Sequence, residues 1–511
     1  MAERSLVLGL DIGTSTIKAG LFTLDGRQVA LATDEYLVIP EGSLRVEVDP
    51  EIFWKGACRV VRWVLAQVPN APMHIVSLSV SSHGETLILL RSDGRPARAA
   101  IFTTDARAEA EALEIAASFE QDWLLKHTGQ PELLGLWPAC KIAWLRRHEP
   151  DTFADIAHFL LPGDYVICRL SGAVSAETSV WGSSMMVDLC TRDWLEPVLE
   201  LVGVRRHKLP ELVPSGTLVG RVTAEAAAET GLPSGTPVVV GAMDQVCAAI
   251  AAGNVRPGVV TASTGSVLAL LATTERPIFD PITRISCYTH AVPGTYCVIP
   301  WNPTGGLVLK WFKDRFGEAE QERARATDQS PYDLLCRAAA AVPPGCEGLV
   351  MLPHLQGVLF PETDLAARGA FFGFSLSHSR AHFTRAILEA VAFMLRDGLE
   401  ALDNLGVKVN EVYVLGGGAR SQLWLQIKAD VCQRPLAVPE AEEAAVLGAG
   451  MLAAVGASVY PDLIAASQSM VRVARRVQPD PALAPTYEEA YSRYHALYKQ
   501  LKPLFHAFRS L

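Results

Sequence analysis

The chain has 511 residues, half of them hydrophobic and a fifth charged, which is typical of a soluble globular protein too long for one hydrophobic core. Its formal net charge is −10 at pH 7 and no Lys/Arg cluster marks a basic face, which argues against a nucleic-acid partner. The first apolar run ends at Asp11, and no other uncharged apolar run reaches about 18 residues. We therefore expect neither a signal peptide nor a membrane partner.

Cysteine usage bears on the compartment. Ten cysteines are scattered along the chain, with no C-x-x-C pair and no metal-ligand spacing. Reduced and mostly buried thiols are the simplest interpretation, and they predict a cytoplasmic protein.

Strand patterns dominate the first part of the chain. Short apolar runs predict strands at 5–13 and 74–80, and Asp-Gly pairs at 25–26 and 93–94 predict hairpin turns. From about 106 to 160, helical patterns take over.

Strands and helices alternate in the second part. The predicted strands are 236–244, a pair within 258–273 joined by a polar turn, and 411–415, which runs into three glycines. The predicted helices are 383–402, ending before Gly406, 421–434, capped by Ser421, and 487–504. The alternation predicts an α/β fold class. The similar β-turn-β units at 6–24 and 258–272 indicate duplication, with a domain boundary near 245–255.

Two of the turns have the composition of anion-binding sites. The stretch DIGTSTIK (11–18) sets a carboxylate beside small residues, whose backbone N–H groups and hydroxyls can face an anion closely. Asp11 repels phosphate and would act through a divalent cation such as Mg²⁺. The stretch ASTGS (262–266) is a second turn of this kind. Taken alone, either turn is more often a simple hairpin.

Three glycines follow the strand at 411–415, in GGGA (416–419). The chain contains no P-loop motif, and GGGA does not match the dinucleotide fingerprint. Bare backbone here would let a flat group lie against it. A tight strand-to-helix turn is the alternative.

Asp244 breaks an apolar strand in VVVGAMDQ (238–245). A buried ionised carboxylate is costly unless something uses it. A general base and a helix N-cap are the two interpretations that the residues leave open.

The order of these motifs resembles the FGGY carbohydrate kinases, of the sugar kinase, Hsp70 and actin superfamily. The resemblance runs from Leu6 to Ala454. It is most specific in GAFFGFSLSHSRAHFTRAILEA (369–390), which matches the family's second signature.

The resemblance implies two ribonuclease-H-like (actin-like ATPase) domains with an interdomain active-site cleft, at 1–250 and 251–475, followed by a helical tail at 476–511. It implies transfer of the ATP γ-phosphoryl group to a sugar or polyol hydroxyl, with Mg²⁺ as cofactor and Asp244 as catalytic base. A homodimer stays open.

The remaining site residues are carried over by position. The ATP-binding set implied by the resemblance is Asp11, which is also the metal ligand, Gly13, Thr14, Ser15, Lys18, Thr264, Gly265, Gly306, Lys310, Gly417, Gly418 and Ala419. Ser421 departs from members that carry Asn near that position.

The substrate-binding set is Ser82, His83, Glu85, Asp105, Arg107 and Gln245. Asp105 and Arg107 either bind or frame the sugar, or form an N-cap with an arginine one turn in. Trp181 and Met185 either line the sugar-binding site or fill the hydrophobic core.

Substrate identity rests on the stretch at 81–85. Xylulokinases have Gln-Met-His-Gly there, whereas this chain has Ser81-Ser82 before His83-Gly84. Glycerol kinases have Arg-Glu next, and only Glu85 matches. D-xylulose or a related pentulose or pentitol is the first expectation. The alternatives are another small substrate (glycerol-, erythritol- or gluconate-like), a non-catalytic ATP-binding regulator, and an Hsp70-like ATPase.

Overall fold

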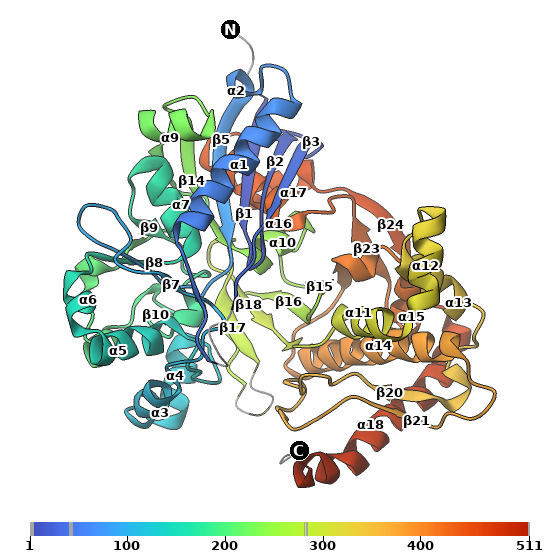
Figure 1. The fold of residues 1–511 in the computed structure, drawn as a ribbon. Coiled ribbons are helices and arrows are strands. Elements are labelled where there is room, and N and C mark those ends of the chain that lie inside the picture. Colours follow the sequence, from blue (N-terminus) through green and yellow to red (C-terminus); the bar gives the residue numbers. More distant parts are fainter. Residues whose placement is uncertain (1–4, 40–43, 281, 283–284, 509–511) are drawn as a thin grey trace. The chain divides into compact units, whose positions relative to one another are not determined.

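The computed structural model describes residues 5–39, 44–280, 282 and 285–508, which form two compact units (Figure 1). Unit 1 comprises 1–256, 273–298 and 443–472, and unit 2 comprises 257–272, 299–442 and 473–511. The expected contiguous domains differ from this division, because two later segments return to unit 1 and the C-terminal tail belongs to unit 2.

Unit 1 is built on a six-stranded sheet in the order β13-β14-β5-β1-β2-β3. Strands β1, β5 and β14 are parallel, and β2, β3 and β13 run antiparallel to their neighbours. All of β1 is buried, which explains its continuous apolar run. The strands are β1 (Leu6–Ile12), β2 (Thr16–Thr23), β3 (Gln28–Glu35), β5 (Ile75–Ser82), β13 (Leu218–Arg221) and β14 (Pro237–Met243).

Helices cover both faces of this sheet. Leu8, Leu10 and Ile12 of β1 point into a core shared with α1 (Glu51–Gln67) and α7 (Pro162–Ser171). Gly9 points to the other face, where α16 (Ala444–Gly456) lies so close that a Cβ at Gly9 would fall 2.0 Å from the Val446 carbonyl oxygen. Also in unit 1 are α9 (Ala224–Thr230), α10 (Asp244–Ala251) and α17 (Leu463–Met470).

The other elements of unit 1 are short. The helices are α2 (Ala71–His74), α3 (Glu109–Ala117), α4 (Gln121–Thr128), α5 (Pro138–His148), α6 (Pro150–Asp155) and α8 (Glu196–Val202). The strands are β4 (Glu47–Val48), β6 (Ile88–Leu90), β7 (Ala100–Ile101), β8 (His158–Leu160), β9 (Ser175–Ala176), β10 (Val187–Asp188), β11 (Asp193–Trp194), β12 (Glu211–Leu212), β17 (Ser286–Thr289) and β18 (Tyr296–Ile299). Single 3₁₀ turns are η1 (Gly182–Ser184) and η2 (Arg206–Lys208).

Unit 2 repeats the central pattern of unit 1. Its strands follow the order β16-β15-β22-β23-β24, with β15, β22 and β23 parallel and β16 antiparallel to β15. The hairpin β15–β16 thus takes the place that β1–β2 takes in unit 1, as the similarity of the two β-turn-β units indicated. The strands are β15 (Val259–Thr264), β16 (Leu268–Thr274), β19 (Trp301–Asn302), β20 (Val350–Leu352), β21 (Ala370–Phe372), β22 (Glu411–Leu415), β23 (Leu436–Pro439) and β24 (Val473–Val477).

Helices of unit 2 surround the long helix α14 (Arg380–Asn404), which packs against α11, α13, α15 and α18 (Figure 1). Ser421 accepts a hydrogen bond from the Trp424 N–H, so it caps α15 as expected. The other helices are α11 (Gly306–Phe316), α12 (Glu318–Thr327), α13 (Pro331–Ala339), α15 (Gln422–Cys432) and α18 (Ala484–Ala507), with 3₁₀ turns η3 (Cys346–Gly348), η4 (Gly417–Ala419) and η5 (Pro481–Leu483).

The α/β prediction is confirmed, and the predicted hairpin turns have glycines at φ +84° (Gly26) and +79° (Gly94). All ten cysteines are free. Within the described ranges no helix combines the length and apolarity that a membrane crossing requires.

Candidate functional site

Acidic and polar side chains gather in unit 1 where the parallel strands end. Asp11 lies near the end of β1, Ser81 and Ser82 end β5, and Asp244 follows β14. Carboxyl ends of parallel strands share one sheet edge, which places these residues together. The Ser81 hydroxyl donates to the Asp11 carboxylate at 2.9 Å.

Asp244 is the first residue of α10, and the N-cap position is Met243. The carboxylate of Asp244 accepts a hydrogen bond from the Gln245 N–H at 2.6 Å. Burial, reinforced by the negative charges of Asp11 and Glu85, raises the pKa of Asp244 to about 7, although the Gln245 N–H lowers it. A carboxyl group that titrates near neutrality is suited to exchanging a proton with a substrate.

Asp11 is also perturbed. Burial raises its pKa to about 6, against the lowering effects of the Ser81 hydroxyl and the Lys18 charge. The Lys18 ammonium forms an ion pair with the Glu443 carboxylate at 2.5 Å, so its expected reach towards a phosphate competes with this pairing.

The first glycine turn lies between β1 and β2. The Gly13 N–H donates to the Thr16 carbonyl at 2.9 Å, and the Tyr36 hydroxyl donates to the Gly13 carbonyl at 2.6 Å. These bonds hold the turn in shape while Thr14 and Ser15 stay exposed. The exposed hydroxyls are thus available to a ligand.

The His83 ring, which we expected to bind substrate, makes its hydrogen bonds within the protein. Its Nδ1 lies 2.8 Å from the Ile12 carbonyl, and its Nε2 lies 2.9 Å from the Thr86 hydroxyl. A carbonyl only accepts, so Nδ1 carries the proton and Nε2 accepts from Thr86. Burial lowers the pKa of His83 to about 4, which keeps the ring neutral. Both ring nitrogens are therefore used within the protein, and His83 ties the β5 loop to β1.

Ser82 is likewise engaged. Its hydroxyl donates to the His83 carbonyl at 2.7 Å and accepts from the Gly163 N–H at 3.0 Å. This side chain therefore holds α7 against the loop.

Glu85 lies on this loop, and its negative charge helps to raise the pKa of Asp244. Its backbone is left-handed at φ +62°, and its side chain accepts hydrogen bonds from Thr103 at 3.0 Å and from Ser183. A left-handed non-glycine residue is strained and persists only when its surroundings hold it. Lys141 does so: its ammonium donates to the Glu85 and Phe102 carbonyls, at 2.8 Å each.

Asp105 and Arg107 form a buried ion pair at 2.6 Å, and Arg107 also pairs with Glu47 at 2.7 Å. Although burial raises it, hydrogen bonds from Arg107 and the Val46 N–H hold the pKa of Asp105 below its ordinary value. The pair does not cap α3, whose N-cap is Ala108. Of the interpretations left open, the geometry fits framing of the site.

Trp181 belongs to the core. It is fully buried, donates to Asp164 at 2.8 Å and meets Trp194 edge-on. Met185 is buried as well, and it lines a cavity beside α4. Core filling is therefore the interpretation that fits both residues.

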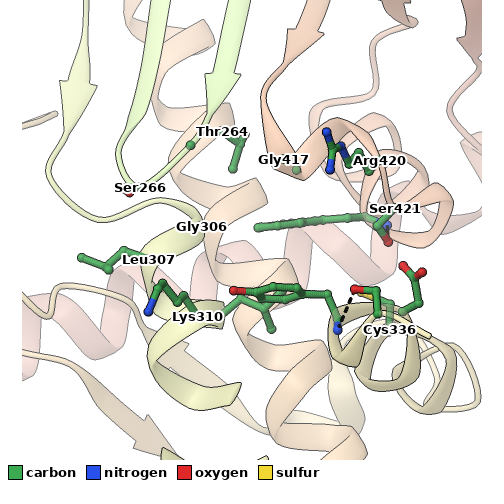
Figure 2. A pocket seen from close by; sticks show the side chains of 16 residues that line it. Thr264, Ser266, Gly306, Leu307, Lys310, Cys336, Gly417, Arg420 and Ser421 are labelled. Atoms are coloured by element: carbon green, nitrogen blue, oxygen red, sulfur yellow. Dashed lines mark hydrogen bonds between the residues drawn. The ribbon is translucent and has the colours of Figure 1, made fainter. Parts of the chain in front are cut away.

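Unit 2 contains a cavity of about 320 Å³ (Figure 2). Figure 2 shows Thr264 and Gly417 on one side of it, and Gly306 and Lys310 of α11 on the other. Six of the expected ATP-binding residues line this cavity, namely Thr264, Gly265, Gly306, Lys310, Gly417 and Gly418. The second and third glycine motifs therefore form one site.

Close backbone contacts shape this cavity. The Gly306 N–H donates to the Gly265 carbonyl at 2.7 Å, so α11 begins directly against the β15–β16 turn. Gly416 has φ +77°, and a Cβ there would fall 2.9 Å from the Thr264 carbonyl oxygen. Lys310 pairs with Asp314 at 2.6 Å, while Ala419 is buried behind the lining.

Asp11 is the carboxylate that we consider as a ligand for Mg²⁺. Among the described residues no group of three or more His, Cys, Asp or Glu side chains is placed to hold a metal ion. Mg²⁺ usually keeps several waters and binds through one or two carboxylates plus phosphate oxygens. The buried Asp11 carboxylate, whose charge raises the pKa of Asp244, matches that mode.

Several residues were missed from the sequence. Lys141 and Lys428 are buried lysines, and their only sequence signal is a cation inside an apolar helical stretch. Tyr332 and Trp424 add aromatic surface to the cavity in unit 2, but ordinary core patterns hide them.

Comparisons with known proteins agree with this geometry. The N-terminal domain model of the FGGY family of carbohydrate kinases matches residues 6–251, and the C-terminal domain model matches residues 258–457. A xylulose kinase of Bacillus subtilis (strain 168) is 29% identical over 504 residues, covering 99% of each chain. An autoinducer-2 kinase of Yersinia enterocolitica is 31% identical over 501 residues, covering 96% of this chain and 94% of that one. The crystal structure of a xylulose kinase from Rhodospirillum rubrum has a TM-score of 0.88 at 32% identity, covering 98% of this chain and all of the other.

Proposed function

The chain belongs to the FGGY family of carbohydrate kinases, and from this premise we propose that it transfers the ATP γ-phosphoryl group to a hydroxyl of a ketose or polyol, with D-xylulose as first candidate. It is an ATP-dependent sugar kinase by family. The observation that carries the mechanism is Asp244, a carboxyl group at a strand end whose pKa is raised to about 7.

Asp244 acts as the general base. A sugar hydroxyl within hydrogen-bond reach gives its proton to the carboxylate as its oxygen attacks the γ-phosphorus. The new O–P bond forms while the bond from the γ-phosphorus to the β-phosphate oxygen breaks, and ADP leaves. The proton stays on Asp244 until it passes to solvent.

The cavity of unit 2 is the proposed nucleotide site. The β15–β16 turn contributes Thr264, Gly265 and Ser266 to the lining, and its two hydroxyls suit phosphates; the bare backbone at Gly417 and Gly418 suits a flat ring. Asp11 would hold Mg²⁺, which supplies charge neutralisation on the phosphates.

Glu85 and Gln245 are the side chains we assign to sugar hydroxyls. Glu85 has a fixed carboxylate near Asp244, and Gln245 adjoins the base. His83, Ser82, Asp105 and Arg107 are assigned to shaping the site, because their polar atoms bond within the protein.

Two substrates compete as the phosphoryl acceptor. Relatives named xylulose kinase favour a ketopentose, and a relative of similar identity is named autoinducer-2 kinase. The Ser81-Ser82 pair, in place of Gln-Met, departs from the xylulokinase pattern and is the reason to test the second candidate. Ser81 is bonded to Asp11, so its difference from xylulokinases lies next to the reacting groups.

The test is ADP release from Mg-ATP against ketoses, aldoses, polyols and autoinducer-2, using the wild type and Asp244→Asn. We expect one substrate to give strong turnover that the substitution lowers by about 10²–10⁴-fold. ATP hydrolysis that ignores every sugar would support the regulatory or ATPase alternatives instead. Strong turnover of autoinducer-2 alone would replace D-xylulose as the substrate and leave the kinase assignment standing.

A further inference from the structure

Helix α15 places a lysine entirely inside unit 2. Lys428 is fully buried, and its ammonium donates to the Thr264 hydroxyl at 2.9 Å. The same nitrogen lies 4.5 Å from the centre of the Trp424 ring, one turn earlier on α15. Within the described part of the chain no carboxylate forms an ion pair with it. A buried cation without an anionic partner is costly, so its position calls for an explanation.

The neighbours of this ammonium are the walls of the proposed nucleotide site. Thr264, Gly418 and Trp424 all line the cavity. A Cβ at Gly418 would fall 2.9 Å from the Lys428 nitrogen and 2.7 Å from the Thr264 Cβ. Lys428 therefore lies directly behind the point where the β15–β16 turn meets the glycine turn after β22. The bare backbone of Gly418 is what lets the two turns approach over it.

The hydrogen bond to Thr264 has one direction when Lys428 is charged. An ammonium group only donates, so the Thr264 oxygen accepts from Lys428. The hydroxyl proton of Thr264 then points elsewhere, and Figure 2 shows this side chain directed from β15 towards the cavity. Burial lowers the pKa of Lys428 to about 7, and an anion in the cavity would favour the charged form.

We propose that Lys428 is a positioning residue for the nucleotide phosphates: it orients the Thr264 hydroxyl to donate to a phosphate oxygen and places a positive charge behind the β15–β16 turn. This inference rests on the proposed binding of ATP in this cavity. Lys428 does not touch the nucleotide. Its contribution depends on the phosphates and not on the adenosine.

The test compares Mg-ADP and adenosine binding by calorimetry in the full-length wild type and Lys428→Met. Losing a hydrogen bond to a charged group, together with the charge, should weaken Mg-ADP binding by about tenfold to a hundredfold. Adenosine affinity should stay within about twofold, because adenosine has no phosphate for the orienting effect to act on. A merely structural role would weaken both ligands alike, and that result would overturn the proposal, as would unchanged Mg-ADP affinity.

Further variants keep the test decisive if Lys428→Met folds poorly. Thr264→Val removes only the hydroxyl and should weaken Mg-ADP selectively, and full Mg-ADP affinity in this variant would overturn the orienting role. Lys428→Arg keeps the charge and should restore part of the affinity lost in Lys428→Met. Lys502→Met removes an exposed lysine charge of α18 in the same unit and should change neither affinity. Wild-type protein that binds adenosine and Mg-ADP equally would refute Lys428's role alone, whereas binding of neither would refute the nucleotide site itself.

Discussion

Replacing Asp244 by Asn tests the proposed chemistry at its centre. Asn keeps the size of the side chain and an oxygen that can accept the Gln245 N–H bond, which is 2.6 Å in the wild type. It removes the proton acceptor. Loss of a positioned general base lowers turnover by about 10²–10⁴-fold, which corresponds to about 3–5 kcal/mol of transition-state stabilisation.

The dependence of kcat/KM on pH gives a second quantitative test of Asp244. A carboxylate accepts a proton only when ionised, so activity should fall as the pH falls through the pKa of Asp244. With that pKa at about 7, kcat/KM should drop about tenfold between pH 8 and pH 6. Mg²⁺ near Asp11 offsets the negative charge that helps to raise this pKa, so more Mg²⁺ should move the acid limb to lower pH.

The assay is steady-state ADP release with the best sugar, from pH 5.5 to 9, for both proteins at matched Mg-ATP saturation. Asp244→Asn should lose turnover and also lose the acid limb in whatever activity remains. Turnover within about threefold of wild type would refute the role of base, since less than 1 kcal/mol would then separate the two proteins. Unchanged Mg-ADP affinity in the variant verifies that unit 2 is intact.

Three more substitutions follow from the site. Asp11→Asn removes the charge assigned to Mg²⁺ and should raise the Mg²⁺ concentration for half-maximal rate by about tenfold or more, and a Mg²⁺ titration unchanged from wild type would contradict that role. Glu85→Gln loses the charge and one of the two oxygens that accept hydrogen bonds from Thr103 and Ser183; the KM for the sugar should rise about tenfold, with Mg-ADP affinity intact by calorimetry. Lys141→Met leaves the Glu85 and Phe102 carbonyls without their donor and should lower the free energy of unfolding by about 2–4 kcal/mol. Scanning calorimetry checks this against Lys126→Met, an exposed lysine on α4, and equal melting temperatures would show that those carbonyls do not need Lys141.

Local patterns in the sequence predicted the turns that line the site. The Asp11 turn, the Thr264 turn and the Gly416–Ala419 stretch were located because tight turns require small residues, whatever their distant neighbours. The partners of His83 and Lys18 were not predictable in this way. Ile12 and Glu443 are brought to them by tertiary packing, which a period of 2 or 3.6 residues does not encode.

The domain limits show the same difficulty on a larger scale. In the sequence, helix α16 looks like an ordinary apolar helix of the second half of the chain. In the structure it packs against β1 and α10 of unit 1. The close approach of Val446 to Gly9 joins positions at opposite ends of the chain. Glycines in a strand mark such approaches without naming the partner.

The placement of α16 also constrains how the protein is made. One face of the sheet in unit 1 is covered by a helix that starts at Ala444, so this sheet stays partly bare until most of the chain has left the ribosome. At about 5–20 residues per second, the roughly 190 residues between Arg256 and Ala444 take on the order of 10–40 s to synthesise. During that interval Gly9 and Val446 have not met, and the nascent chain carries exposed apolar strand surface that chaperones recognise. Unit 2 interrupts unit 1 in the gene, and unit 1 can finish folding only after most of unit 2 has been translated.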